Sequence, residues 1–154
     1  MKLEKNAAAP QFSLPDQEGN LVNLKDFLGN KVLVYFYPKA DTPGCTTQAC
    51  SLRDAWKELK QAGVTVLGIS PDNVAAQKKF AGKFSLNFAL LADEDHAVAE
   101  AYGVWVEKMN YGKTYMGIER STFLIDADGK IAQAWRKVKV KGHVDAVLDA
   151  VRGL

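Results

Sequence analysis

The 154-residue sequence has few residues of the kinds that mark a specialised class of protein. It contains only two cysteines, which excludes a small domain held together by several disulfides. The two histidines and two cysteines match no zinc-binding spacing, so we expect no metal. The sequence has neither a P-loop nor a dinucleotide-binding glycine motif, so we expect no nucleotide cofactor.

Charge and long apolar runs are also scarce. A formal net charge of +2 is too small to indicate a nucleic-acid partner. The longest apolar runs, Val32–Tyr37 and Val64–Ile69, are far shorter than the roughly 20 residues that cross a membrane. Residues 1–10 lack the apolar segment of a secretion signal. We therefore expect a cytoplasmic protein in a reducing compartment, where cysteines are more often reactive or metal-binding than structural.

The apolar pattern predicts one α/β domain spanning residues 1–154. Expected strands are Phe12–Leu14, Leu21–Leu24, Lys31–Tyr37, Val64–Ser70, Phe88–Leu91, Ser121–Ile125 and Ile131–Arg136. Expected helices are Cys45–Ala62, Pro71–Lys83, His96–Tyr102 and Gly142–Arg152, with an irregular loop over Gly103–Gly117. This order predicts a central mixed β-sheet flanked by helices, preceded by a short β-hairpin.

The two cysteines share one short segment, which follows a strand predicted to be buried. Cys45 comes directly after Pro43 and Gly44, and a helical pattern of apolar residues follows it. We therefore expect Cys45 at the opening of a helix, where unpaired N–H groups and the helix dipole favour a thiolate over a thiol. Because the thiolate is the nucleophilic form of cysteine, this segment is the candidate site.

The residues around Cys45 resemble a known signature. The spacing Pro38-x-x-x-Thr42-x-x-Cys45 is similar to the active-site motif of the peroxiredoxin family, and the five-residue step to Cys50 resembles its bacterioferritin comigratory protein (peroxiredoxin Q) subgroup. The similar stretches extend along nearly the whole chain and are Phe12–Asp16, Val32–Cys50, Val66–Ser70 and Arg120–Asp126. The resemblance implies a thioredoxin-like fold with an N-terminal β-hairpin extension.

The resemblance also implies a thiol-dependent peroxidase. Cys45 would attack a peroxide oxygen and become a sulfenic acid. The helix dipole supplies only about 0.3–1 kcal/mol, or up to about 2 kcal/mol when partly buried, so a fixed cation is expected nearby, and the family places Arg120 there. Donors to the developing negative charge would be Arg120, the Thr42 hydroxyl and the N–H groups of Gly44 and Cys45. Pro38 would shield the thiolate from water.

Cys50 is implied as the resolving thiol, which forms an intramolecular disulfide with Cys45. Its alternative role is that of a small buried apolar residue. Residues five apart on an α-helix are about 8.6 Å apart at Cα, whereas a disulfide needs roughly 4.4–6.8 Å. The pair can therefore bond only if the first turns of the helix unwind. Gln48, where many peroxiredoxins carry Glu, is expected to cap the helix or position a neighbour.

The implied reaction needs no cofactor. Its substrates would be hydrogen peroxide and organic hydroperoxides, and a dithiol donor such as thioredoxin would recycle the enzyme. We expect a monomer, although the sequence leaves a dimer open. Two other functions also stay open at this point. A thioredoxin-like disulfide reductase or isomerase would carry C-x-x-C in place of the C-x₄-C found here, and a non-enzymatic redox-sensing module would be oxidised without rapid turnover.

Overall fold

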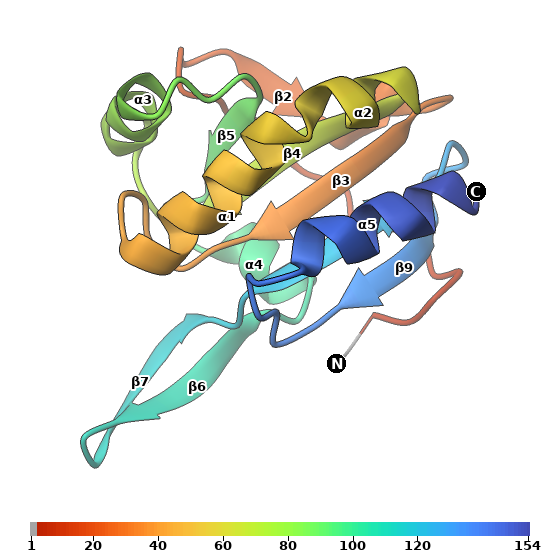
Figure 1. Ribbon diagram of the computed structural model, residues 1–154. Helices are drawn as coiled ribbons and strands as arrows, with labels where there is room; N and C mark the ends of the chain where they lie inside the picture. The colour runs from red at the N-terminus through yellow and green to blue at the C-terminus, as the bar shows by residue number, and fades with distance from the viewer. Residues whose placement is uncertain (1–2) are drawn as a thin grey trace.

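The computed structural model describes residues 3–154, and a five-stranded mixed β-sheet forms its centre (Figure 1). In spatial order the strands are β5 (Ala89–Ala92), β4 (Val64–Ser70), β3 (Lys31–Phe36), β8 (Ser121–Ile125) and β9 (Ile131–Trp135). β3, β4 and β5 are parallel to one another, whereas β8 pairs antiparallel with both β3 and β9. The mixed sheet predicted from the sequence is confirmed.

Side chains of β3 alternate between two apolar clusters, one on each face of the sheet. Leu33 and Tyr35 pack with the cluster that includes residues of α1 (Pro43–Asp54), α2 (Trp56–Gln61), α3 (Val74–Lys83) and α5 (His143–Arg152). Val34 and Phe36 pack with the cluster that includes residues of β1 (Ser13–Pro15), η1 (Leu24–Phe27) and α4 (Ala97–Ala101). β1 pairs with β2 (Leu21–Asn23) as the predicted N-terminal hairpin.

The predicted helix over Cys45–Ala62 differs from the structure in two ways. The helix starts two residues earlier, because Pro43 occupies its first position, where the N–H that proline lacks is not needed. It is also split in two at Ala55, whose φ of −91° and ψ of 1° interrupt the helical geometry. No glycine or proline marks that break in the sequence. Cys45 and Cys50 both lie in the first part, α1.

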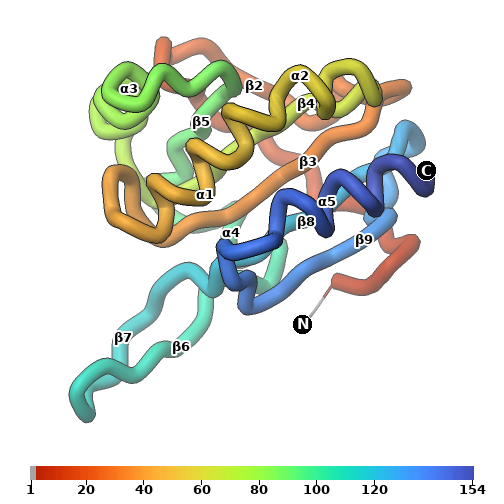
Figure 2. The backbone as a smooth tube through the Cα atoms, viewed as in Figure 1, coloured from red at the N-terminus to blue at the C-terminus, as the bar shows by residue number. Residues whose placement is uncertain are grey.

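The prediction of an irregular loop over Gly103–Gly117 was wrong. Most of this segment forms an antiparallel hairpin of β6 (Trp105–Asn110) and β7 (Lys113–Ile118), which projects away from the main sheet (Figures 1 and 2). Tyr111 and Gly112 turn the chain with φ values of 52° and 77°. The sequence signal was weak because Tyr-Gly is not one of the favoured turn pairs, and because an exposed hairpin needs no alternation of apolar residues.

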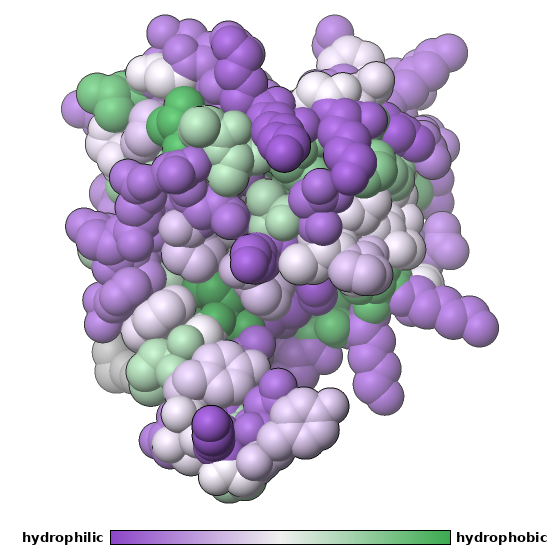
Figure 3. Space-filling view, turned by 90° about the vertical axis from the view of Figure 1, so that its left-hand side faces the viewer, coloured by the Kyte–Doolittle hydropathy of each residue, from purple (hydrophilic) through white to green (hydrophobic). Residues whose placement is uncertain are grey.

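The face that carries α3, at the left of Figure 1, is mostly hydrophilic with small separate apolar patches (Figure 3). Within residues 3–154, none of the helices has the length and apolar composition needed to cross a bilayer. The same residues contain no cluster of three or more His, Cys, Asp or Glu side chains able to hold a metal ion.

His143, the first residue of α5, makes the fold sensitive to acid. Its Nε2 lies 2.8 Å from the Thr122 hydroxyl, and burial, with a smaller contribution from the charge of Arg120, lowers the pKa of His143 from 6.5. The unfolded chain therefore binds a proton near pH 6.5 that the folded protein does not bind. The free energy of unfolding consequently decreases as the pH falls through this range. We expect the melting temperature of His143→Gln to fall less than that of the wild type when the pH is lowered from 7.5 to ~5.5. Equal losses in thermal unfolding would contradict this assignment.

Candidate active site

Cys45 lies in the first turn of α1, with only 1% of its surface exposed. Thr46 N–H donates to the Thr42 carbonyl at 2.8 Å, which is where helical hydrogen bonding begins. The N–H groups of Gly44 and Cys45 precede that bond, so neither has an acceptor within the helix. They belong to the positive end of the helix dipole, where a thiolate is favoured.

Arg120 reaches Cys45 because of the register of the sheet. Antiparallel pairing places Ser121, the first residue of β8, opposite Phe36, the last residue of β3. Arg120 therefore lies beside the loop that leads from β3 into α1. Its carbonyl accepts a hydrogen bond from the Val138 N–H at 2.9 Å, which holds its backbone in place. Its Nη2 donates to the Cys45 sulfur at 3.2 Å.

Two residues of α1 shape the position of the Arg120 guanidinium. Gln48 is 1% exposed, and its Oε1 accepts a hydrogen bond of 2.6 Å from Arg120 Nη1. Gln48 thus contacts Arg120 rather than capping the helix. A Cβ atom built on Gly44 would lie 3.2 Å from Arg120 Nη2, so a larger residue there would crowd the guanidinium. These contacts orient the Arg120 guanidinium towards the Cys45 sulfur.

The other predicted site residues lie nearby but make different contacts. Thr42 occupies the N-cap position of α1 without a side-chain capping bond, and its hydroxyl donates to the Lys39 carbonyl at 2.8 Å. Pro38 is half-buried in the loop that follows β3. Cys50 is half-buried on α1, and both cysteines are free. Since both thiols lie on one intact helix, the structure is that of the unbonded state.

Sequence reasoning missed Lys108, because it lies on the β6–β7 hairpin that was predicted to be a loop. Burial and the nearby positive charge of Arg120 lower the pKa of Lys108, while Glu119 and Cys45 act in the opposite direction. Lys108, Arg120 and Lys137 line a groove of about 400 Å³. No sequence motif indicated this placement, which depends on how the hairpin returns to β8.

Two buried polar groups at α1 have no hydrogen-bond partner within residues 3–154. They are the Tyr35 hydroxyl, on β3 beneath the helix, and Gln48 Nε2. Neighbouring Tyr37, whose ring stacks on Tyr35 at 5.4 Å between centroids, does find a partner, because its hydroxyl donates to Gln77. Burial raises the pKa of both tyrosines, so both hydroxyls keep their protons at neutral pH. The packing under α1 is therefore tight but not fully satisfied.

Comparison with protein families gives one match over most of the chain. The model of the AhpC/TSA family matches residues 6–134. Among curated proteins, the peroxiredoxin Bcp of Escherichia coli strain K12 is 60% identical over 147 residues, covering 96% of this chain and 94% of the relative. The peroxiredoxin Bcp of Bacillus subtilis strain 168 is 46% identical over 154 residues, covering 100% and 98%.

Solved structures similar to this chain come from the same group of proteins. The bacterioferritin comigratory protein of Xanthomonas campestris, studied for its alkyl peroxide reduction activity, is 42% identical with a TM-score of 0.90, covering 98% of this chain and 96% of that one. A cysteine-to-serine mutant of PrxQ from Xylella fastidiosa is 32% identical with a TM-score of 0.94, covering 99% and 98%. The thioredoxin-like fold predicted from the sequence is confirmed.

Proposed function

Because this chain belongs to the AhpC/TSA family of peroxiredoxins, it is a thiol-dependent peroxidase, and we propose that Cys45 is the thiol that attacks the peroxide. The observation that carries this assignment is the 3.2 Å hydrogen bond from Arg120 Nη2 to the Cys45 sulfur, in the first turn of α1. A helix terminus and a fixed guanidinium both favour the negative charge that a nucleophilic sulfur needs.

In the proposed first step, the Cys45 thiolate attacks one oxygen of the peroxide and the oxygen–oxygen bond breaks. Cys45 becomes a sulfenic acid, and the second oxygen leaves with the bonding pair and takes a proton, giving water or an alcohol. Arg120 and the N–H groups of Gly44 and Cys45 are positioned to stabilise the leaving charge. The Thr42 hydroxyl joins them by rotating away from the Lys39 carbonyl, and Pro38 excludes water.

In the second step, Cys50 attacks the Cys45 sulfenic acid and forms a disulfide. Both residues lie on α1, where helical geometry sets their Cα atoms about 8.6 Å apart, so the first turns must unwind. Thr46 and Thr47 are weak helix formers, which lowers the cost of unwinding. Unwinding would break the hydrogen bond between Gln48 and Arg120. The same segment therefore cannot hold the peroxide-binding geometry and the disulfide at the same time.

A reductant must return the disulfide to two thiols, and we propose thioredoxin or a similar dithiol donor. Hydrogen peroxide and organic hydroperoxides are the proposed substrates, and the alkyl peroxide reduction described for the Xanthomonas relative supports the second class. We further propose one domain over residues 1–154, a monomer, no cofactor, and a cytoplasmic location in which such a donor keeps both thiols reduced.

The geometry favours this function over a disulfide reductase, whereas turnover distinguishes it from a redox sensor. A reductase of the thioredoxin type exposes the first cysteine of its motif to a protein disulfide, whereas Cys45 is 1% exposed and faces a guanidinium. A redox sensor would break the same oxygen–oxygen bond but would be oxidised without rapid turnover, so turnover distinguishes it from a peroxidase. The assay that separates the three is peroxide consumption with a thioredoxin system, run beside insulin disulfide reduction.

We expect Cys45→Ser to abolish peroxide-dependent oxidation, because it removes the nucleophile. Cys50→Ser should still consume one equivalent of peroxide and stop at a sulfenic acid, since only the resolving step is lost. Labelling with dimedone followed by mass spectrometry locates the intermediate. A label on Cys50 in place of Cys45 would reverse the assignment, and wild-type turnover by Cys45→Ser would exclude it.

Arg120→Ala should slow the oxidation of Cys45 by about 10²–10³-fold, the usual effect of removing one donor from a developing oxyanion. The measurement is the second-order rate constant with hydrogen peroxide in the Cys50→Ser background. Arg136→Ala is the matched control, because Arg136 is also half-buried but donates to the Leu3 carbonyl instead of a thiol. An unchanged rate in Arg120→Ala removes this residue from the mechanism.

Oxidation should unwind the start of α1 and leave the rest of the fold intact. We expect amide protection to fall from about Pro43 to Leu52 on disulfide formation, while β3 and α2 keep theirs because their apolar residues form the core. Hydrogen exchange on reduced and oxidised protein measures this difference. Equal protection of that segment in both states, with a Cys45–Cys50 bond confirmed by mass spectrometry, would disprove the unwinding.

A further inference from the structure

The loop between β3 and α1, which carries Pro38 and Thr42, is held by a side chain that the proposed first step does not use. Asp72, in the segment that leads from β4 to α3, accepts a hydrogen bond of 2.7 Å from the Ala40 N–H through its Oδ2 atom. Asp72 and Ala40 are 32 positions apart in the sequence. The carboxylate therefore attaches the loop to a different part of the fold.

The Ala40 N–H and the Lys39 carbonyl belong to one planar peptide group. Asp72 binds the N–H of this group, and the Thr42 hydroxyl donates to its carbonyl at 2.8 Å. By holding the peptide, Asp72 therefore also holds the Thr42 oxygen. Rotation about the Cβ–Oγ bond of Thr42 turns the proton towards a peroxide without moving that oxygen. The peptide thus connects Asp72 to a group that the proposed first step uses.

Asp72 is itself fixed from the core. Its Oδ2 atom accepts a second hydrogen bond, of 2.6 Å, from the hydroxyl of Ser70, a fully buried residue of β4. Ser70 Oγ accepts in turn from Gln77 Nε2 at 2.8 Å, and the same nitrogen donates to the Leu91 carbonyl at 2.9 Å. Gln77 Oε1 accepts from the Tyr37 hydroxyl. A buried network whose members are hydrogen-bonded in this way is rigid, so Asp72 is a fixed point for the loop.

The loop needs this support, because its backbone is not in a relaxed conformation. Asp41 has a φ of 60°, which residues with a side chain adopt rarely and keep only where surrounding contacts impose it. A second contact of the loop is the ion pair of Asp41 with Lys83 at 2.9 Å, whose side chains are 35% and 54% exposed. Ion pairs exposed to this degree contribute little to stability. Asp72 is therefore the stronger attachment of the two.

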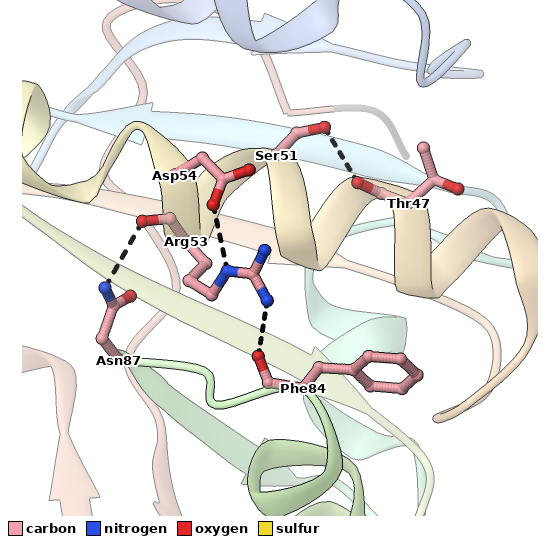
Figure 4. Close-up of polar contacts among 6 residues, drawn as sticks. All are labelled: Thr47, Ser51, Arg53, Asp54, Phe84 and Asn87. Carbon is pink, nitrogen blue, oxygen red and sulfur yellow. Dashed lines mark hydrogen bonds and ion pairs between the residues drawn. The ribbon is translucent and has the colours of Figure 1, made fainter.

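The other end of α1 is attached separately. Arg53 Nη1 donates to the Phe84 carbonyl at 2.7 Å, and the Asn87 side chain donates to the Arg53 carbonyl at 3.3 Å (Figure 4). Removing the Asp72 carboxylate leaves both of these hydrogen bonds in place. A substitution of Asp72 should therefore disturb the loop before α1 and not the helix as a whole.

We propose that Asp72 is a positioning residue for the peroxide-cleaving step, in which it fixes the Thr42 hydroxyl through the Lys39–Ala40 peptide. This inference rests on the proposed role of Thr42 in that step. A displacement of about 1 Å in a group that acts on the reacting atoms lowers the rate strongly. A residue that never touches the peroxide therefore still controls how fast the oxygen–oxygen bond breaks.

The test separates the hydrogen bond of Asp72 from its charge. Asp72→Ala removes the acceptor, whereas Asp72→Asn keeps an acceptor oxygen and removes the charge. Lys83→Gln is the control, because it removes the exposed contact of the same loop. Thr42→Val removes the hydroxyl without breaking a capping bond, since the Thr42 side chain makes none.

Each variant is made in the Cys50→Ser background, and two rates are measured at Cys45. The first is oxidation by hydrogen peroxide, and the second is alkylation by iodoacetamide. Alkylation needs the thiolate and access to it but no donor to an oxygen, so it reports general damage to the site. Thermal unfolding checks that each variant is folded. Ser70→Ala, which frees the Asp72 carboxylate from the core, replaces Asp72→Ala if that variant does not fold.

We expect Asp72→Ala to slow oxidation by about 10- to 100-fold, the effect of a displaced reacting group, and to leave alkylation unchanged. Ser70→Ala should slow oxidation by a smaller factor. Asp72→Asn should restore most of the oxidation rate, and Lys83→Gln should match the Cys50→Ser parent. In the Thr42→Val protein, Asp72→Ala should cause no further loss, because the two residues act as one unit.

An oxidation rate equal to that of the parent in Asp72→Ala, or in Ser70→Ala where it replaces that variant, overturns the inference. Losses that add in the double variant with Thr42→Val, or an equal fall in oxidation and alkylation, also overturn it. An unchanged oxidation rate in Thr42→Val would instead reject the proposed role of Thr42, and this inference with it.

Discussion

The antiparallel pairing of β3 with β8 is the constraint on which the site depends. It brings Arg120 to the end of β3 although 75 positions separate Arg120 from Cys45 in the sequence. The pairing holds because both strands are buried on both faces, with Leu33 and Leu124 on one side and Val34 and Phe123 on the other. A shift by one residue would turn every one of these side chains to the wrong face. The register that builds the core therefore also sets the distance between cation and thiol.

The sequence predicted strands and helices correctly wherever local sequence signals and the burial of apolar residues favour the same structure. Continuous apolar runs located β3 and β4, and Pro43 with Gly44 located the start of α1 within two residues. It failed where structure depends on pairing outside the core. The β6–β7 hairpin buries little, so it needs no apolar alternation. Lys108 was missed for the same reason, because its position follows from the path of that hairpin.

The candidate site shows the same division between local and distant information. Cys45 could be singled out from its neighbours alone, since a thiol at a helix start is a local feature. Arg120 came from a family resemblance, because periodicity says nothing about which strands pair. The contact of Gln48 with Arg120 could not be read from periodicity either, because it joins residues 72 positions apart that only the pairing of β3 with β8 brings together.

α1 has to satisfy two opposed requirements. Closed, it holds Cys45 beside Arg120 through Gln48, and Ala49 and Leu52 bury completely against the sheet. Open, it must let two thiols meet that the helix keeps apart. The Tyr35 hydroxyl and Gln48 Nε2, which have no partner among residues 3–154, bear on this balance, because a buried donor without a partner costs about 1–3 kcal/mol. Gln48 regains water when the first turns unwind, which recovers part of that cost. A helix with every donor satisfied would hold the thiolate as well but would open less readily, so incomplete satisfaction at α1 is consistent with a segment that must move in every cycle.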